Sequence, residues 1–149
     1  MKTRTEVSAG AVVYRATPGG TYDVALILTH EGRWQLPKGW VEDGEDHAAT
    51  AAREVREETG LDAAIIGALE SIEYWYRSTY EPEPVRVHKF VHFYLARYEA
   101  GSVDDHDDEV QEARWFAIDE AIDRLAFDSE RTVMQKARAA LEQAQESHA

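Results

Sequence analysis

Three glutamates, Glu54, Glu57 and Glu58, stand at positions i, i+3 and i+4 of one segment. In a helix these positions lie within roughly 100° of arc, so the three carboxylates would share one face. Like charges at this spacing repel, at about 0.2–0.5 kcal/mol per pair in an isolated helix. A hard divalent cation such as Mg²⁺ would offset that repulsion, because it prefers oxygen ligands and shares substrate phosphates. The alternative is a solvated acidic face softened by Arg53 and Arg56, and the bare pattern favours it.

The segment that carries these glutamates, residues 46–59, has the clearest helical pattern in the chain. Apolar residues recur along one side of it at helical spacing: Ala48, Ala51, Ala52 and Val55. Gly60 follows as a natural C-terminal stop. The sequence therefore predicts a helix that presents the carboxylates between two loops.

Strands are predicted on both sides of this helix. Residues 5–14 and 22–29 are rich in β-branched side chains and are separated by a Pro-Gly-Gly turn, and residues 85–95 alternate between apolar and polar. The remaining expected elements are a short strand giving way to a loop in 33–41, strands at 65–80 and 113–118, a hairpin loop at 81–84, an acidic loop at 104–109 and a helix at 129–146, with Val133, Ala137, Ala140, Leu141 and Ala144 as its buried stripe. This order predicts an α/β fold in which helices cover a mixed β-sheet.

Composition narrows the class of protein. The 149 residues suit one domain spanning 1–149. A net charge of −13 disfavours duplex nucleic acid and anionic membranes as partners. The absence of cysteine excludes disulfides, zinc–thiolate sites and thiol nucleophiles. With no apolar run of signal-peptide or transmembrane length, we expect a soluble cytoplasmic protein.

The residues around the glutamates complete a longer pattern. Gly39 is followed by five residues and Glu45, and seven further residues lead to Arg53, the glutamates and Gly60-Leu61. Residues 39–61 resemble the Nudix box of the Nudix hydrolase family at every defining position. The resemblance implies a Nudix-type α/β/α sandwich and hydrolysis of a nucleoside diphosphate linked to another moiety. It also implies Mg²⁺ as the cofactor, with Mn²⁺ as a substitute.

The resemblance assigns roles to residues of the box. Glu57 and Glu58 would be metal ligands, and Glu54 either a third ligand or the base that activates water. Arg53 would orient the carboxylates by pairing with Glu45 or with a helix glutamate. Clustered carboxylates raise one another's pKa and a bound cation reverses that shift, so the site is expected to work only with metal.

Two further metal ligands are implied outside the helix. One is the carbonyl oxygen of Lys38, directly before Gly39, where a glycine lets the backbone approach the site closely. The other is a glutamate from a later loop, and Glu109 is the candidate because it precedes Trp115 by six residues, a spacing similar to the family's. Glu112 is the substitute, and the alternative is that 104–109 is a solvated acidic loop.

The flanks of the box bear on the substrate. Residues 34–39 resemble the dinucleoside polyphosphate and diphosphoinositol polyphosphate branches, and Tyr76 follows the box at a position similar to a tyrosine of diadenosine polyphosphate hydrolases. Aromatic rings stack on bases, although tyrosine equally suits a strand core. Lys38 and Arg33 are expected to bind outer phosphates.

These flanking features favour a dinucleoside polyphosphate as the substrate. The alternatives are a housecleaning nucleoside triphosphate pyrophosphatase, a diphosphoinositol polyphosphate phosphohydrolase and a non-catalytic nucleotide-sensing Nudix module. The expected partner is a small phosphorylated molecule, and the chain is expected to be a monomer or a homodimer.

Overall fold

The computed structural model describes residues 1–147. Within them, a seven-stranded mixed sheet has the order β3-β2-β1-β6-β5, with β4 paired to β1 and β7 paired to β2. The strands are β1 (Lys2–Ala16), β2 (Tyr22–Leu28), β3 (Trp34–Gln35), β4 (Lys38–Trp40), β5 (Leu61–Ser78), β6 (Val85–Gly101) and β7 (Glu112–Ala117). The helices are α1 (His47–Thr59), α2 (Ile118–Arg124), α3 (Asp128–Ser147) and the short 3₁₀ turn η1 (Val103–Asp105).

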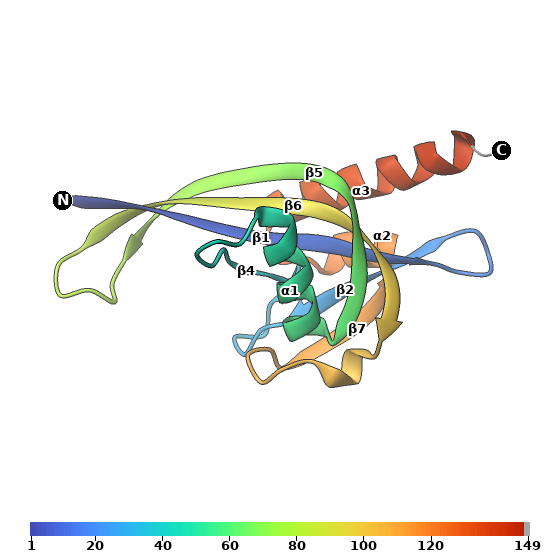
Figure 1. Cartoon of the computed structure of the whole chain (residues 1–149), viewed down its shortest axis with the longest axis horizontal. Coiled ribbons are helices and arrows are strands. Elements are labelled where there is room, and N and C mark those ends of the chain that lie inside the picture. Colours follow the sequence, from blue (N-terminus) through green and yellow to red (C-terminus); the bar gives the residue numbers. More distant parts are fainter. Residues whose placement is uncertain (148–149) are drawn as a thin grey trace.

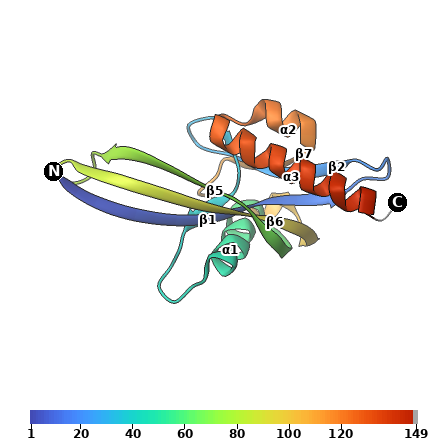
Figure 2. The same ribbon diagram turned by 90° about the horizontal axis from the view of Figure 1, so that it is seen from above.

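Helices cover both faces of the sheet. Helix α1 lies on one face, and α2 and α3 lie on the other (Figures 1 and 2). Because side chains alternate along a strand, β1 supplies both layers. Ala11 belongs to the apolar cluster that contains Val55 of α1, whereas Val12 belongs to the cluster that contains Met134 and Leu141 of α3. The predicted α/β/α arrangement with a mixed sheet is confirmed.

The local predictions fail mainly where tertiary packing extends or shortens an element. Strands β5 and β6 are longer than expected because they pair from Leu61 and Gly101 to the hairpin. Helix α2 was not predicted, since its N-cap Ala117 offers no side-chain hydrogen bond and the helix buries Ile118 on the core. Ala144 was expected to be buried but is exposed, because the end of α3 lies at the β1–β2 turn, where Gln145 donates to the Gly20 carbonyl, and not on the apolar cluster.

Three strands form an arm that reaches beyond the helices. The arm, defined as residues 2–7, 71–78 and 85–90, lies at the left of Figure 1. In it β1 runs parallel to β6 and β5 runs antiparallel to β6. The alternation predicted for 85–95 is confirmed, with Val85, Val87 and Val91 buried.

Within residues 1–147, none of the helices combines the length and the apolar character needed to cross a bilayer.

Candidate active site

Helix α1 is held at both ends by specific caps. The Asp46 carboxylate accepts a hydrogen bond from the Ala49 amide at 2.7 Å. Gly60 ends the helix at φ 77°, and a Cβ there would lie 2.3 Å from the carbonyl oxygen of Ser102. Ala51 and Val55 are fully buried on the sheet. These contacts fix the rotation of α1 and therefore the direction of its glutamates.

The helix glutamates face the strand that precedes α1. Glu54 and Glu58, one turn apart, are only 7% and 8% exposed, while Glu57 lies at the exposed rim. The Lys38 amide donates a hydrogen bond to Glu58 at 2.7 Å. A Cβ on Gly39 would lie 2.0 Å from the Glu54 carboxyl carbon, so only glycine lets β4 approach the helix this closely.

Arg53 ties the acidic groups together. Its guanidinium donates to Glu45 at 2.7 Å, to Glu54 at 2.9 Å and to Glu57 at 3.2 Å. It also donates to the Trp40 carbonyl at 3.0 Å. Hydrogen bonds, first from Arg53, lower the pKa of Glu45 to about 2. Of the two pairings expected for Arg53, the structure contains both.

The buried carboxylates are short of positive charge. Burial raises the pKa of Glu58 to about 8, and the charges of Glu54 and Asp107 add to the effect. Burial also raises the pKa of Glu54, despite Arg53, and Glu57 and Glu109 contribute repulsion. Such carboxylates are the groups that a cation would stabilise.

The acidic loop 104–109 packs against the C-terminal end of α1. The Asp107 amide donates to the Glu57 carbonyl at 2.8 Å. The loop therefore brings Glu109 within electrostatic range of Glu54. The substitute, Glu112, lies in β7, where its carboxylate accepts a hydrogen bond from Arg114 at 2.7 Å. Sequence reasoning did not single out Asp107, although it lies in the same acidic loop.

The donor set suits the divalent cation that the family resemblance implies. Carboxylate oxygens are hard ligands of the kind that Mg²⁺ and Mn²⁺ bind, and the raised pKa values of Glu54 and Glu58 belong to carboxylates that a cation would stabilise. Among residues 1–147, no three acidic or imidazole side chains converge on one point. Instead, the Glu54 carboxylate accepts a hydrogen bond from Arg53, and the Glu58 carboxylate accepts one from the Lys38 amide. A cation would have to compete with these two contacts.

A cavity of about 420 Å³ opens beside Lys38, on the side of α3. The Lys38 ammonium group binds Glu130 at 2.7 Å and Gln35 at 3.0 Å. Tyr74 and Phe127, each partly exposed, supply aromatic walls. Lys38 thus contacts the glutamate helix through its amide and the cavity through its side chain.

Glu130 fixes the geometry of this cavity. It is 2% exposed, and besides Lys38 it accepts the Leu36 amide at 2.7 Å. Nothing in the local sequence distinguishes Glu130 or Phe127, because both are separated from residues 35–38 by most of the chain. Only the docking of α3 brings them together.

The other two residues expected to bind the substrate, Arg33 and Tyr76, do not line the Lys38 cavity. The Arg33 guanidinium is 5.9 Å from the Phe127 ring centroid, at the rim of the cavity. Tyr76 lies in the arm, where its hydroxyl donates to Glu6 at 2.7 Å. Tyr74, two residues earlier on the same face of β5, lines the cavity instead.

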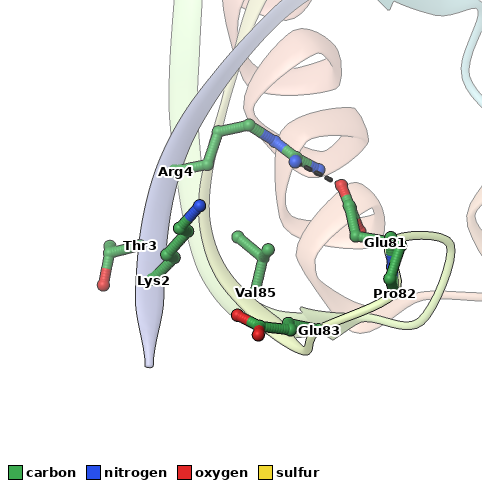
Figure 3. Close-up of a pocket in the computed structure, with 7 residues that line it drawn as sticks. All are labelled: Lys2, Thr3, Arg4, Glu81, Pro82, Glu83 and Val85. Carbon is green, nitrogen blue, oxygen red and sulfur yellow. Dashed lines mark hydrogen bonds and ion pairs between the residues drawn. The ribbon is translucent and has the colours of Figure 1, made fainter.

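A larger surface groove, of about 720 Å³, lies elsewhere. It is formed at the tip of the arm, where Arg4 pairs with Glu81, and Figure 3 shows its lining residues: Lys2, Thr3, Arg4, Glu81, Pro82, Glu83 and Val85. No residue of the box lines it. The candidate site is therefore the glutamate face of α1 together with the Lys38 cavity.

Comparison with known proteins identifies the family. The NUDIX domain model matches residues 4–136, and the chain belongs to this family. A Mycobacterium tuberculosis protein provisionally named mutator protein MutT4 is 41% identical over 92% of this chain and 56% of its own length. An 8-oxo-(d)GTP phosphatase of Mycolicibacterium smegmatis is 32% identical over 87% of this chain and 40% of its own length. The chain thus spans about half the length of these two relatives.

Other similar proteins match over most of both chains. The asymmetrical bis(5'-nucleosyl)-tetraphosphatase of Rattus norvegicus is 31% identical over 78% of each chain. The crystal structure of a Caenorhabditis elegans Ap4A hydrolase binary complex superposes with a TM-score of 0.68, at 23% identity, and covers 92% of this chain and 98% of that one. At this identity, the structural match speaks for the fold.

Proposed function

We propose that this chain is a Mg²⁺-dependent pyrophosphohydrolase of small nucleotides. The observation that carries the proposal is the junction at Lys38, where a crowded carboxylate face adjoins an aromatic cavity. A bound cation would stabilise the ionised carboxylates of Glu54 and Glu58, whose pKa values are raised. The cavity is large enough for an organic group. A nucleotide has both parts, an anhydride that binds metal and a base that stacks on aromatic rings.

The residues divide the catalytic work. Bound Mg²⁺ would supply charge neutralisation at the phosphate oxygens and activation of water. Glu57 and Glu58 are the proposed ligands, and Glu109 completes the set from its loop. Glu54, whose pKa is raised by burial, is a further ligand or the base that takes a proton from water. Arg53 holds Glu54 and Glu57 in place through its hydrogen bonds.

Within this class, we infer a dinucleoside polyphosphate as the substrate. The rat tetraphosphatase, with 31% identity over most of both chains, supports the inference. So does the cavity, where Tyr74 and Phe127 offer surfaces for a base. Lys38 and Arg33 lie at or near the same cavity and are the candidate contacts for outer phosphates.

A second candidate is a nucleoside triphosphate, including an oxidised one. It is favoured by the names of the mycobacterial relatives at 41% and 32% identity. Both candidates would use the same carboxylates and the same cavity. They differ in the group beyond the cleaved anhydride, which is a second nucleotide in one case and a phosphate or pyrophosphate in the other.

A substrate panel with Mg²⁺ and chromatographic identification of products tests the proposal. It should contain dinucleoside tetraphosphates, nucleoside triphosphates, 8-oxo-dGTP, ADP-ribose and diphosphoinositols, with Glu57→Gln as the inactive control. We expect kcat/KM to be highest for dinucleoside tetraphosphates and to exceed that for ADP-ribose. A higher value for 8-oxo-dGTP would select the second candidate, and nucleotide binding without turnover would indicate a sensor module.

Paired tyrosine variants test the cavity. Tyr74→Leu removes an aromatic wall and is expected to raise KM by roughly tenfold, since stacking on a base contributes about 1–3 kcal/mol. Tyr76→Leu removes a tyrosine of the same strand face that is bonded to Glu6. If Tyr76→Leu raises KM more than Tyr74→Leu, the base stacks on Tyr76, as the sequence alone indicates.

A further inference from the structure

Strand β5 has one unpaired edge. It pairs with β6 alone among the described strands, and it is the last strand in the sheet order. Its register irregularities all precede Glu70, so residues 71–78 run straight along the arm. A regular edge of this kind presents a row of unpaired N–H and C=O groups to another strand.

Two of the usual protections of an edge strand, proline and lysine, are missing here. Residues 71–78 contain no proline and no lysine. Instead, Tyr74, Trp75 and Tyr76 are 43%, 49% and 39% exposed. The arm reaches past α1 and α3 (Figures 1 and 2), and only its inner end, at residues 72–74, lies beside the start of α3, across the Lys38 cavity. An exposed aromatic run on an open edge is typical of an interaction surface.

The charges of this edge are complementary to themselves. Glu73 and Arg77 stand two residues before and two residues after Trp75. Arg77 is exposed and has no ion-pair partner within residues 1–147. Glu73 binds His88 at 2.6 Å but keeps its side chain 63% exposed. When two copies of this segment run antiparallel about Trp75, each glutamate meets an arginine.

We propose that two copies of this chain pair through their β5 edges, antiparallel, with Trp75 opposite Trp75 of the partner subunit. A two-fold axis perpendicular to the sheet requires one residue to lie opposite its own copy. With Trp75 in that place, Glu73 lies opposite Arg77 of the partner subunit, and Tyr74 lies opposite Tyr76 of the partner subunit. Opposite-charge and aromatic pairs are the cross-strand contacts that stabilise antiparallel strands.

Neighbouring registers lack this complementarity. Centring the pair on Tyr74 would set Glu73 against Trp75 of the partner subunit and leave Arg77 against a serine. Centring it on Tyr76 would set Arg77 against Trp75 of the partner subunit and leave Glu73 against a threonine. The net charge of −13 opposes association of two copies. The two pairs of Glu73 with Arg77 of the partner subunit offset part of that repulsion, and they form only in the register centred on Trp75. This pairing does not depend on the proposed function.

A charge swap tests both the dimer and its register. The molar mass of the 149-residue chain, measured by sedimentation over a range of concentrations, is expected to approach that of a dimer. Arg77→Glu sets like charges opposite each other twice and is expected to weaken Kd by at least about tenfold. Glu73→Arg combined with Arg77→Glu is expected to restore the wild-type Kd. Arg124→Glu, on the exposed side of α2, is the matched control and is expected to leave Kd unchanged.

Cysteine cross-linking supplies a second measurement in a chain without native cysteine. Directly opposed residues lie within disulfide reach, so Trp75→Cys is expected to cross-link to itself on oxidation. Glu73→Cys alone is not, whereas a mixture of Glu73→Cys and Arg77→Cys is. A monomer at every concentration overturns the proposal, because the edge then serves another partner or none. A dimer that Arg77→Glu leaves intact, or that the double swap fails to restore, overturns it as well.

Discussion

Two regions that contain buried carboxylates, the glutamate face of α1 and the arm, treat them differently. In the arm, burial of Glu6 acts to raise its pKa, but hydrogen bonds from Tyr76 and Arg4 and the charge of Lys89 outweigh burial and lower it. In the α1 region, burial raises the pKa of Glu58 to about 8. Both carboxylates are 8% exposed, so burial alone does not explain the difference.

Charge balance explains it. Glu6 has Lys89 at 3.7 Å, Arg4 at 3.0 Å and the Tyr76 hydroxyl at 2.7 Å. The α1 face has one guanidinium, that of Arg53, for several carboxylates. Removing one partner from a balanced network of this kind destabilises the fold, whereas an unbalanced network is stabilised when a cation binds. Variants in the two regions test that distinction, from the largest expected effect to the smallest.

The α1 carboxylates should matter for turnover and hardly for folding. Glu57→Gln or Glu58→Gln is expected to lower kcat by about 10²–10⁴-fold, as loss of a positioned acid–base or orienting group does. Glu58→Gln should also raise the Tm of the metal-free protein near neutral pH, because glutamine does not have to take up a proton on folding, and should reduce the Tm gain on adding Mg²⁺. Steady-state kinetics and thermal melts check both effects. Glu120→Gln on α2 is the control. If all the α1 variants keep a near-wild-type kcat, the glutamate face of α1 is a solvated surface without a catalytic role.

The arm should show the reverse pattern. Lys89→Met leaves the buried Glu6 with only Arg4 and Tyr76 as partners and is expected to lower the free energy of unfolding by about 1–3 kcal/mol. Adding Glu6→Gln should recover much of that loss, since the buried side chain is then neutral. Urea unfolding measures both variants. The kcat of the folded protein should stay near wild type, and a hundredfold loss would show that the arm belongs to the catalytic site.

The stability of the metal-free protein should depend on pH through Glu58. Its pKa rises from 4.5 to about 8 on folding, so the folded state holds a proton that the unfolded state releases. The free energy of unfolding is therefore expected to fall as pH rises from about 4.5 to about 8, by a few kcal/mol at most, and to level off above. The charges that face Glu58 are Lys38, which lowers its pKa, and Glu54 and Asp107, which raise it.

Chemical unfolding in a chelator at several pH values measures this dependence. Glu58→Gln should flatten the curve in the same window. Excess Mg²⁺ should flatten it as well, because a bound cation competes with the proton. A curve for Glu58→Gln that falls as steeply as that of the wild type would assign the dependence to other groups.

The smallest effect is expected at Tyr76. Tyr76→Phe removes the hydrogen bond to Glu6 and keeps the ring, so the free energy of unfolding should fall by about 1 kcal/mol. Its KM for the best substrate of the panel should not change. A raised KM with unchanged stability would place the Tyr76 hydroxyl at the substrate.

The two regions also differ in how far the sequence predicts them. The glutamate face follows from helical geometry and from the caps Asp46 and Gly60, all within one short segment. The acidic loop was predicted as a second source of carboxylates, but only its packing on α1 separates Glu109 from Glu112. In the arm, the sequence indicated apolar alternation in 85–95, yet it did not indicate that Lys89 is buried beside Glu6.

The sequence by itself determined that three carboxylates share one helix face, because the spacing of Glu54, Glu57 and Glu58 on one helix depends on local hydrogen bonds alone. It also determined the family and the layered fold. Tertiary structure decided what surrounds those residues, since Lys38 meets Glu130, and Tyr74 faces Phe127, only after α3 has docked on the sheet. Contacts between residues far apart in the chain depend on packing and on charges brought in from other elements, and no short stretch of sequence records them.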